Sequence, residues 1–290
     1  MSNIQITENE SGKYSPEWFY NEAQKPEWIA FIRKADTLHE NFINHFGIEH
    51  LKSLSGKELL TSLFYNDKGN KLNLCYVLEM DKDMREIFGS IAGGAAYKFG
   101  LFFHKKTQSW TCGSPAKPVK LTENEAIQKA EEIRNDLVAG AEIISSFGPL
   151  NSTADYEQLY KQPEHISGIN TVWRMKYYQM LFPILFAPFY GQDIQLDVLH
   201  FLNQTPSEIP FIRMGQIALF SKKCNIPGIV FGHIWGRSTN HNNKSNDSET
   251  NTLSDKKHKL HYWMYTVFDD TSWMECQQKE IMVLGMDDIG

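Results

Sequence analysis

The chain has 290 residues, is 41% hydrophobic and 22% charged, and carries a net charge of −6 at pH 7. These values are typical of a globular protein with one large domain or two ordinary ones, and they do not favour a surface coated with phosphate-binding groups. No apolar run approaches the roughly 20 residues of a membrane-spanning helix, and the polar, acidic N-terminus lacks a signal-peptide pattern, so we expect a cytoplasmic protein with no membrane partner.

The N-terminal part of the chain is predicted to be helical. Ser15 can cap a helix that continues to residue 46, Pro16 suits its first turn, and aromatic side chains recur along it. Residues 55–64 are predicted to form a second, shorter helix.

Residues 71–112 are predicted to form an antiparallel β-meander. Residues 71–80 alternate between apolar and polar side chains, which is the period of a half-buried strand. Residues 95–106 and 109–112 follow as further strands. The glycine-rich residues 89–94 would connect these strands, since adjacent glycines allow positive φ and tight reversals.

The same glycine-rich stretch, GSIAGGAAYKFG, raises the question of a phosphate loop. Gly89 and Gly94 have the separation of the two Walker glycines, but alanines follow Gly94 where that loop requires Lys and then Ser or Thr. Ile91 breaks the G-x-G-x-x-G spacing of dinucleotide sites. A turn or bulge is therefore the favoured interpretation, and an approach of bare backbone amides and Lys98 to a ligand phosphate is the alternative.

The second half of the chain is predicted to be helical before its composition changes. Thr122 begins the clearest helix, because Glu125 follows it at the spacing of a capping box. Residues 171–235 are predicted to be helical again. Residues 236–257 contain a single apolar side chain, which favours a flexible linker.

We therefore predict an α+β fold in which an antiparallel β-meander packs with helices. Residues 1–150 would form an α+β domain that holds the meander, and residues 151–236 a helical region that packs on it or follows it. Residues 237–259 would be a flexible linker, and residues 260–290 the truncated start of a β domain.

No catalytic residue and no metal site is predicted. The ten histidines do not combine with Cys or carboxylate side chains at a ligand spacing. The four cysteines contain no C-x-x-C pair, which is typical of reduced thiols in a cytoplasmic protein. Neither G-x-S-x-G nor H-E-x-x-H is present, so whether the chain is an enzyme stays open.

Local charge indicates one basic segment. Residues 71–120 contain 8 basic and 4 acidic side chains, a net charge of +4. In this segment and in the helix after residue 171, basic side chains lie among aromatic ones, a mixture that can neutralise phosphates and stack bases. The competing interpretation is that the aromatic side chains form core and the lysines solvate it. The candidate nucleic-acid-binding residues are Lys98, His104, Lys105, Lys106, Trp110, Arg174 and Lys176.

Three stretches follow one another in the chain: FGSIAGGAAYKFGLFF, VWRMKYYQMLFPILFAPFY and GQIALFSKKCNIP. Their order, the pattern W-x-x-K-Y-x-x-x-L-F-P in the second and the initial Gly-Gln of the third resemble the N-terminal region of McrB-like AAA+ NTPases. These are the motor subunits of modification-dependent restriction systems. The matching positions are Trp173, Lys176, Tyr177, Leu181, Phe182, Pro183, Gly215 and Gln216.

The last residues, 261–290, resemble the opening of an EVE-like, PUA-related module. Met286 stands where that family has tryptophan. The resemblance associates this module, and with it Trp263 and Trp273, with holding a flipped modified base in an aromatic pocket. The matching positions are Tyr262, Trp263, Trp273, Ile281, Gly285, Asp287, Ile289 and Gly290.

The resemblance implies a region that recognises DNA, or a modified base in DNA, for a restriction complex of anti-phage defence. The parent protein would use GTP or ATP with magnesium and would act with a nuclease subunit through a part absent from this chain. The chain itself would need no cofactor and hydrolyse no nucleotide. The alternative is a protein-interaction or assembly module of the same kind of complex, which the acidic segment 121–170 favours.

Overall fold

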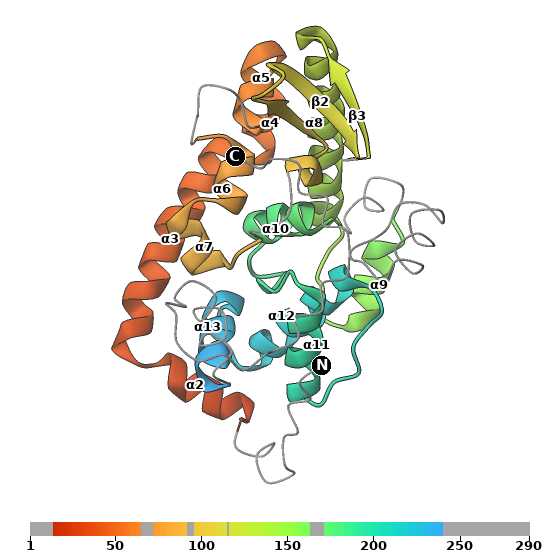
Figure 1. The fold of residues 1–290 in the computed structure, drawn as a ribbon. Coiled ribbons are helices and arrows are strands. Elements are labelled where there is room, and N and C mark those ends of the chain that lie inside the picture. Colours follow the sequence, from red (N-terminus) through yellow and green to blue (C-terminus); the bar gives the residue numbers. More distant parts are fainter. Residues whose placement is uncertain (1–13, 65–71, 92–95, 115, 163–170, 240–290) are drawn as a thin grey trace, which may run out of the picture. The chain divides into compact units, whose positions relative to one another are not determined.

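The computed structural model describes residues 14–64, 72–91, 96–114, 116–162 and 171–239 (Figure 1). All of these residues belong to one compact unit, whose limits are Met1–Ser245, and the second unit lies outside the described ranges. The described part is mostly helical and contains a small antiparallel sheet of three strands. The predicted α+β class is confirmed for this part of the chain.

The N-terminal helices agree with the sequence. The Ser15 hydroxyl accepts a hydrogen bond from the Trp18 backbone N–H at 3.2 Å, which confirms the predicted cap. The predicted helix over 15–46 is divided in two at Gln24 and Lys25, because a new helix begins at the following proline. The helices are α2 (Pro16–Ala23), α3 (Pro26–Phe46), α4 (Ile48–Ser53) and α5 (Gly56–Leu63).

Residues 71–80 do not form the predicted strand, because helix α6 (Leu74–Glu79) occupies most of this segment. The Asn73 side chain caps the helix by accepting a hydrogen bond from the Tyr76 backbone N–H at 2.8 Å. Leu72, the first apolar residue of the alternating pattern, is 70% exposed. The prediction is wrong because a short apolar run that is buried on most sides fits a helix as well as a strand.

The glycine-rich stretch consequently does not join two strands. It follows helix α7 (Lys82–Phe88), which ends at Gly89 with a φ of +77°. Residues 92–95 lie outside the described residues, and the chain continues with the short 3₁₀ helix η1 (Ala96–Phe99).

The sheet consists of β1 (Leu101–His104), β2 (Ser109–Ser114) and β3 (Lys117–Leu121), paired antiparallel in that order. The strands predicted over 95–106 and 109–112 are confirmed in part, whereas β3 had no counterpart in the sequence prediction. Gly113 has a φ of +91°, and a Cβ there would lie 2.5 Å from the Lys117 carbonyl oxygen. The tight β2–β3 connection therefore requires glycine.

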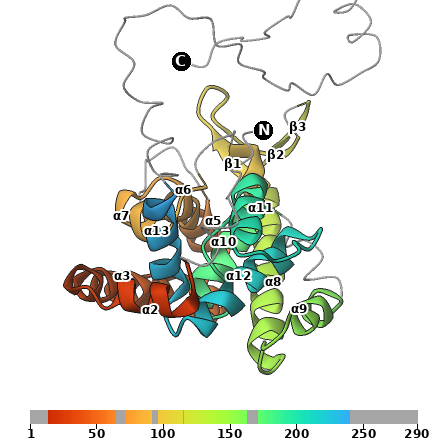
Figure 2. The same ribbon diagram turned by 90° about the horizontal axis from the view of Figure 1, so that it is seen from below.

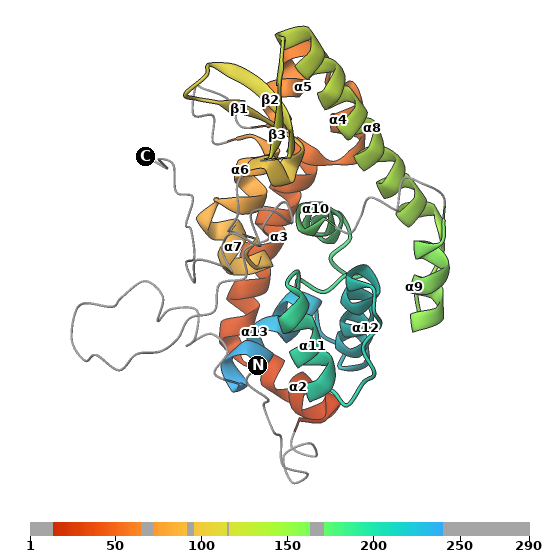
Figure 3. The same ribbon diagram turned by 45° about the vertical axis from the view of Figure 1, so that its right-hand side comes forward.

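Helix α8 (Glu123–Ser146) confirms the helix predicted from Thr122. The Thr122 hydroxyl accepts a hydrogen bond from the Glu125 N–H at 3.3 Å, and the Glu125 carboxylate accepts one from the Thr122 N–H at 2.7 Å. These two bonds form the predicted capping box. The helix packs against all three strands and against α4 and α5, and α9 (Thr153–Tyr160) follows it (Figure 3).

The helical region predicted over 171–235 is confirmed. Its helices are α10 (Val172–Leu181), α11 (Gln192–Phe201), α12 (Pro210–Lys223) and α13 (Gly228–Ser238). Helix α10 contacts α3, α6 and α8 (Figure 3), while α13 packs on α2 (Figure 2). The first and last helices of the described part thus share a core, and the predicted division after residue 150 falls inside this unit.

The rest of the predicted organisation lies outside the described residues. This applies to the linker 237–259 beyond residue 239, and to the EVE-like module over 260–290 with Trp263 and Trp273. Within the described ranges, no helix is both long enough and apolar enough to cross a bilayer.

Candidate functional site

The three-stranded sheet lies in a stretch of sequence without acidic residues. Residues 87–122 contain five lysines and neither Asp nor Glu. The Lys98 side chain is partly buried and forms an ion pair with Glu79. The other four are exposed, and they are Lys105, Lys106, Lys117 and Lys120.

One face of the sheet packs on the core. Phe103 of β1 lies opposite Trp110 of β2, which lies opposite Leu121 of β3. The rings of Phe103 and Trp110 meet edge-on with centroids 5.4 Å apart, and Trp110 is 7% exposed. Because the α8 helix contacts all three strands, this face is closed to a large ligand.

We call the opposite face the outer face of the sheet. It is formed by the row Phe102, Thr111 and Lys120 across the three strands, with His104 two residues after Phe102. Phe102 and Thr111 are themselves buried, so only the rim of this face is open to solvent. The Tyr97 ring packs edge-on against Phe102 at 4.6 Å between centroids. Tyr97 and His104 are half-buried and Lys120 is exposed, so aromatic and basic side chains reach solvent on the same face.

The β1–β2 turn places Lys105 and Lys106 at the end of the sheet. The Thr107 backbone N–H donates to His104 Nδ1 at 3.2 Å, and Gln108 Nε2 donates to the Lys105 carbonyl oxygen at 2.7 Å. Gln108 itself has a φ of +49°. These local bonds fix the backbone of the turn, so the two exposed lysines leave it at defined positions.

Four of the residues proposed from the sequence are engaged within the fold. Lys98 forms an ion pair with Glu79, and its side chain is 23% exposed. Trp110 lies on the core face of the sheet. The structure brings His104, Lys105 and Lys106 together at one end of the sheet, and Lys120 lies on the outer face opposite Thr111. Lys117 is also exposed, but it pairs with Ser114 at the other end of β2. Neither Lys117 nor Lys120 had an aromatic neighbour in the sequence to mark it.

The remaining two of these four residues, Arg174 and Lys176, lie on helix α10. Arg174 has a side chain that is 15% exposed, forms an ion pair with Asp136 at 3.5 Å and lies over the Trp173 ring. Lys176 is fully buried, and its Nζ donates to the Gly89 carbonyl oxygen at 2.6 Å. Burial lowers the pKa of Lys176 to about 7.

The Lys176 bond is part of a larger arrangement that we call the carbonyl clamp. Helix α7 ends with backbone carbonyls that have no partner inside the helix and that carry the negative end of its dipole. Side chains from α13, from the segment before α11 and from α10 donate to the carbonyl oxygens of residues 87–89. The Lys98 side chain donates to the carbonyl oxygen of Ile91. The pairs are Ile87 with His233 at 3.3 Å, Phe88 with Tyr190 at 2.7 Å, Gly89 with Lys176 at 2.6 Å, and Ile91 with Lys98 at 3.1 Å.

The clamp explains what the first glycine of the stretch does. Gly89 has a positive φ, and a Cβ there would lie 3.1 Å from the Pro188 carbonyl oxygen and 3.3 Å from the Tyr190 ring. The close approach of Tyr190, which the clamp needs, therefore depends on glycine.

The motif residues that carry the family resemblance also have contacts inside the fold. The Tyr177 hydroxyl donates to the Phe46 carbonyl oxygen at 3.0 Å. Gly215 lies directly against the Tyr156 ring. The Gln216 side chain accepts from the Ser207 N–H at 2.9 Å and donates to the Thr205 carbonyl oxygen at 3.0 Å. These residues position helices α10 and α12.

No protein-family model, curated protein or solved structure matches this chain. Within the described residues, no three His, Cys, Asp or Glu side chains are grouped in a way that could hold a metal ion. The functional assignment therefore depends on the geometry of the sheet.

Proposed function

We propose that the outer face of the sheet and the β1–β2 turn bind nucleic acid, with DNA as the polymer. The observation that carries the proposal is the set of four exposed lysines, two in the β1–β2 turn and two on β3, in a stretch without acidic residues. Lysines neutralise phosphates, and the adjacent Tyr97 and His104 rings offer surfaces on which bases can stack. The binding residues would be His104, Lys105, Lys106, Lys117 and Lys120.

The charge of the whole chain sets the character of this binding. With a net charge of −6, the protein as a whole is repelled by a polyanion, so attraction is confined to the sheet. Each lysine–phosphate contact with duplex DNA adds about −0.9 to the slope of log affinity against log salt, so four contacts would give a slope of about −3.6. Association is therefore expected to be modest and strongly salt-dependent.

The alternative, a protein-interaction module that uses the acidic surface of α8, receives less support. Several acidic side chains of this helix already have basic partners in the same chain. Glu123 pairs with Lys57 at 2.9 Å and Glu142 pairs with Lys52 at 2.5 Å. A surface neutralised in this way offers little charge to a basic partner.

The resemblance to McrB-like proteins extends the proposal. In that reading, the described unit is the recognition region, for DNA or a modified base, of a restriction motor that uses GTP or ATP with magnesium and acts with a nuclease subunit. The EVE-like residues that would add a base pocket lie outside the described residues, so this extension rests on the sequence.

The test removes the four lysines together. Lys105→Ala, Lys106→Ala, Lys117→Ala and Lys120→Ala in one chain should make the salt slope shallower by about 3 to 4 and weaken binding most at low salt. Fluorescence anisotropy with labelled duplex DNA, single-stranded DNA and RNA, from about 50 to about 200 mM salt, measures both quantities.

A matched control removes four exposed lysines elsewhere and changes the net charge equally. These are Lys25, Lys82, Lys161 and Lys223. Equal salt slopes for the two quadruple variants would exclude the sheet as the binding site. An intact protein that binds none of the three polymers at low salt would favour the protein-interaction alternative.

A further inference from the structure

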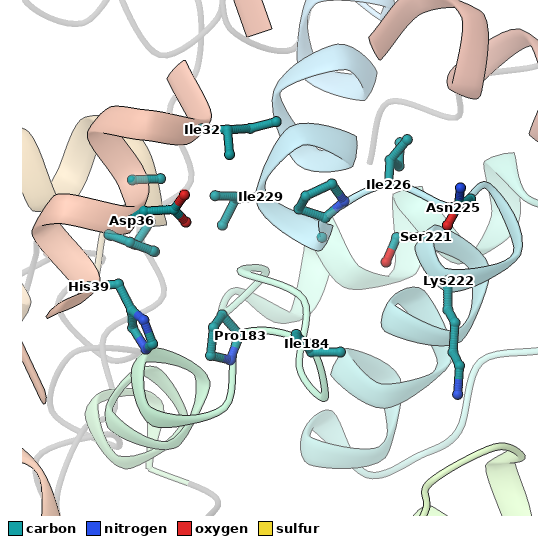
Figure 4. A pocket seen from close by; sticks show the side chains of 14 residues that line it. Ile32, Asp36, His39, Pro183, Ile184, Ser221, Lys222, Asn225, Ile226 and Ile229 are labelled. Carbon is teal, nitrogen blue, oxygen red and sulfur yellow. The ribbon is translucent and has the colours of Figure 1, made fainter. Parts of the chain in front are cut away.

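A cavity of about 520 Å³ lies remote in sequence from the sheet, and none of its lining residues belongs to a strand. Its walls come from α3, the end of α7, the segment after α10, the end of α12 and the start of α13, and Figure 4 shows the side chains that line it. This volume lies within the range of about 300–1,000 Å³ that is usual for small-molecule sites.

The walls of the cavity are mainly apolar. Ala35 and Phe88 are buried side chains of the hydrophobic core, whereas Ile184 at the edge of the cavity is 83% exposed. An apolar interior with few polar groups favours a ligand with an apolar body. The apolar lining residues are Ile32, Ala35, Phe88, Pro183, Ile184, Ile226, Pro227 and Ile229.

Asp36 supplies a negative charge to this lining. Its carboxylate points from α3 toward Ile229 across the cavity (Figure 4). The Asp36 carboxylate makes no hydrogen bond or ion pair with another residue of the described part. Because the residue is exposed, the carboxylate keeps contact with water while it faces apolar side chains.

His39 also lines the cavity, one turn from Asp36 on α3, and its buried Nε2 has no hydrogen-bond partner among the described residues. The polar groups on the opposite wall are Ser221, Lys222 and Asn225. Lys222 runs away from Asp36 (Figure 4), and its Nζ donates to Asn151 Oδ1 at 2.6 Å. The Ser221 hydroxyl donates to the Ala218 carbonyl oxygen at 2.9 Å. The cavity thus combines an apolar interior with one carboxylate, which lies beside an imidazole, while the Lys222 ammonium group points away from it.

We propose that this cavity binds an organic ammonium ion, with the ammonium group at Asp36 and the apolar body between the isoleucines. Opposite charge explains the preference for a cation, since a charge-assisted hydrogen bond to a carboxylate is stronger than a neutral one. Apolar burial holds the body of the ligand and accounts for the four isoleucines in the walls. This site is separate from the proposed nucleic-acid surface, and either can fail alone.

The lining isoleucines provide the readout. In full-length protein with labelled isoleucine δ1 methyl groups, Ile32, Ile184, Ile226 and Ile229 report on the cavity by NMR. The probes are 2-phenylethylamine, its neutral analogue 2-phenylethanol and the anion 3-phenylpropanoate. We expect the amine to shift these four methyl signals and to bind about tenfold more tightly than the alcohol, because it gains a hydrogen bond to a charged group.

Two variants locate the charge effect. Asp36→Asn should bring the affinity for the amine to that for the alcohol while the apolar interior still binds both. Glu40→Gln removes an equal charge from an exposed position one turn further along α3, outside the cavity lining, and should keep the preference for the amine.

Three results would overturn the proposal. The first is that none of the probes shifts the four reporter signals. The second is that amine and alcohol bind equally to the unmodified protein. The third is that Asp36→Asn keeps the preference for the amine, which would place the ammonium group elsewhere.

Discussion

The buried Lys176 shows how a basic residue in an aromatic motif can serve the fold. Its Nζ makes one hydrogen bond, to Gly89, and it lies over the Tyr190 ring at 5.7 Å. Desolvation, with a smaller contribution from the nearby Arg85 charge, lowers its pKa from a usual value of 10.5 to about 7. The sequence does not distinguish this buried lysine from an exposed one, because its burial depends on contacts with distant segments.

The pKa of Lys176 leads to a prediction about stability. Between about pH 7 and 10.5 the unfolded chain keeps a proton on Lys176 that the folded chain has lost. Since the unfolded state then binds more protons, the free energy of unfolding should rise with pH, by about 1.4 kcal/mol per pH unit from this group. Lys176→Met should remove this contribution, so its stability relative to the unmodified protein should fall as pH rises.

Urea unfolding of both proteins from pH 6 to 10 measures the difference, in which all other titrations cancel. Lys161→Met, at an exposed position, is the control and should show a constant difference across this range. A constant difference for Lys176→Met as well would mean that the folded pKa is close to its usual value.

At the scale of elements, the sequence predicted helices best where local bonds define their ends. The Ser15 cap and the Thr122–Glu125 capping box lie within four residues, so the sequence contains the whole signal. Helix α6 was missed because its six residues are too few to distinguish the two periods. Strand β3 was missed because its residues are mostly exposed and show no alternation.

The packing of α9 on α12 leads to a second stability prediction. A Cβ at Gly215 would overlap the Tyr156 ring. The Tyr156 hydroxyl donates to the Leu185 carbonyl oxygen at 2.6 Å, which keeps that ring in place. Gly215→Ala should therefore destabilise the protein by about 1–3 kcal/mol through overpacking. Urea unfolding measures the loss.

Gly232→Ala is the matched control. It adds the same methyl group in helix α13, where the nearest atom, in the Phe189 ring, would be 3.4 Å away. Because alanine favours helix over glycine, this variant should be neutral or slightly stabilising. Equal losses from both alanines would show that the tight α9–α12 contact has no special role.

At the scale of the whole described unit, its first helix, α2, and its last two helices, α12 and α13, meet in one core. Phe19 of α2 is fully buried and lies 5.9 Å from the Phe220 ring and 4.9 Å from the Phe231 ring. Sequence patterns give no long-range pairing, so the predicted division after residue 150 could not anticipate this contact. For the same reason the sequence could mark Lys105 and Lys106, which are adjacent in the chain, but not Lys120, whose place on the outer face of the sheet depends on the strand register.

This shared core leads to a third stability prediction. Phe19→Ala should destabilise the whole described unit by about 3–5 kcal/mol, as other buried aromatic truncations do. Urea unfolding followed by circular dichroism should show one shifted transition. Tyr20→Ala, on the same helix but 41% exposed, should change stability little. Separate transitions in Phe19→Ala would show that the N- and C-terminal helices unfold independently.

The carbonyl clamp constrains the length of the chain as well as its sequence. Four acceptor oxygens between residues 87 and 91 meet donors fixed on η1, on α10, before α11 and on α13. An insertion or deletion inside this span would shift every later acceptor away from its donor at once. Related chains should therefore tolerate length changes in the lysine-bearing β1–β2 turn, yet preserve the spacing from 87 to 91 residue for residue.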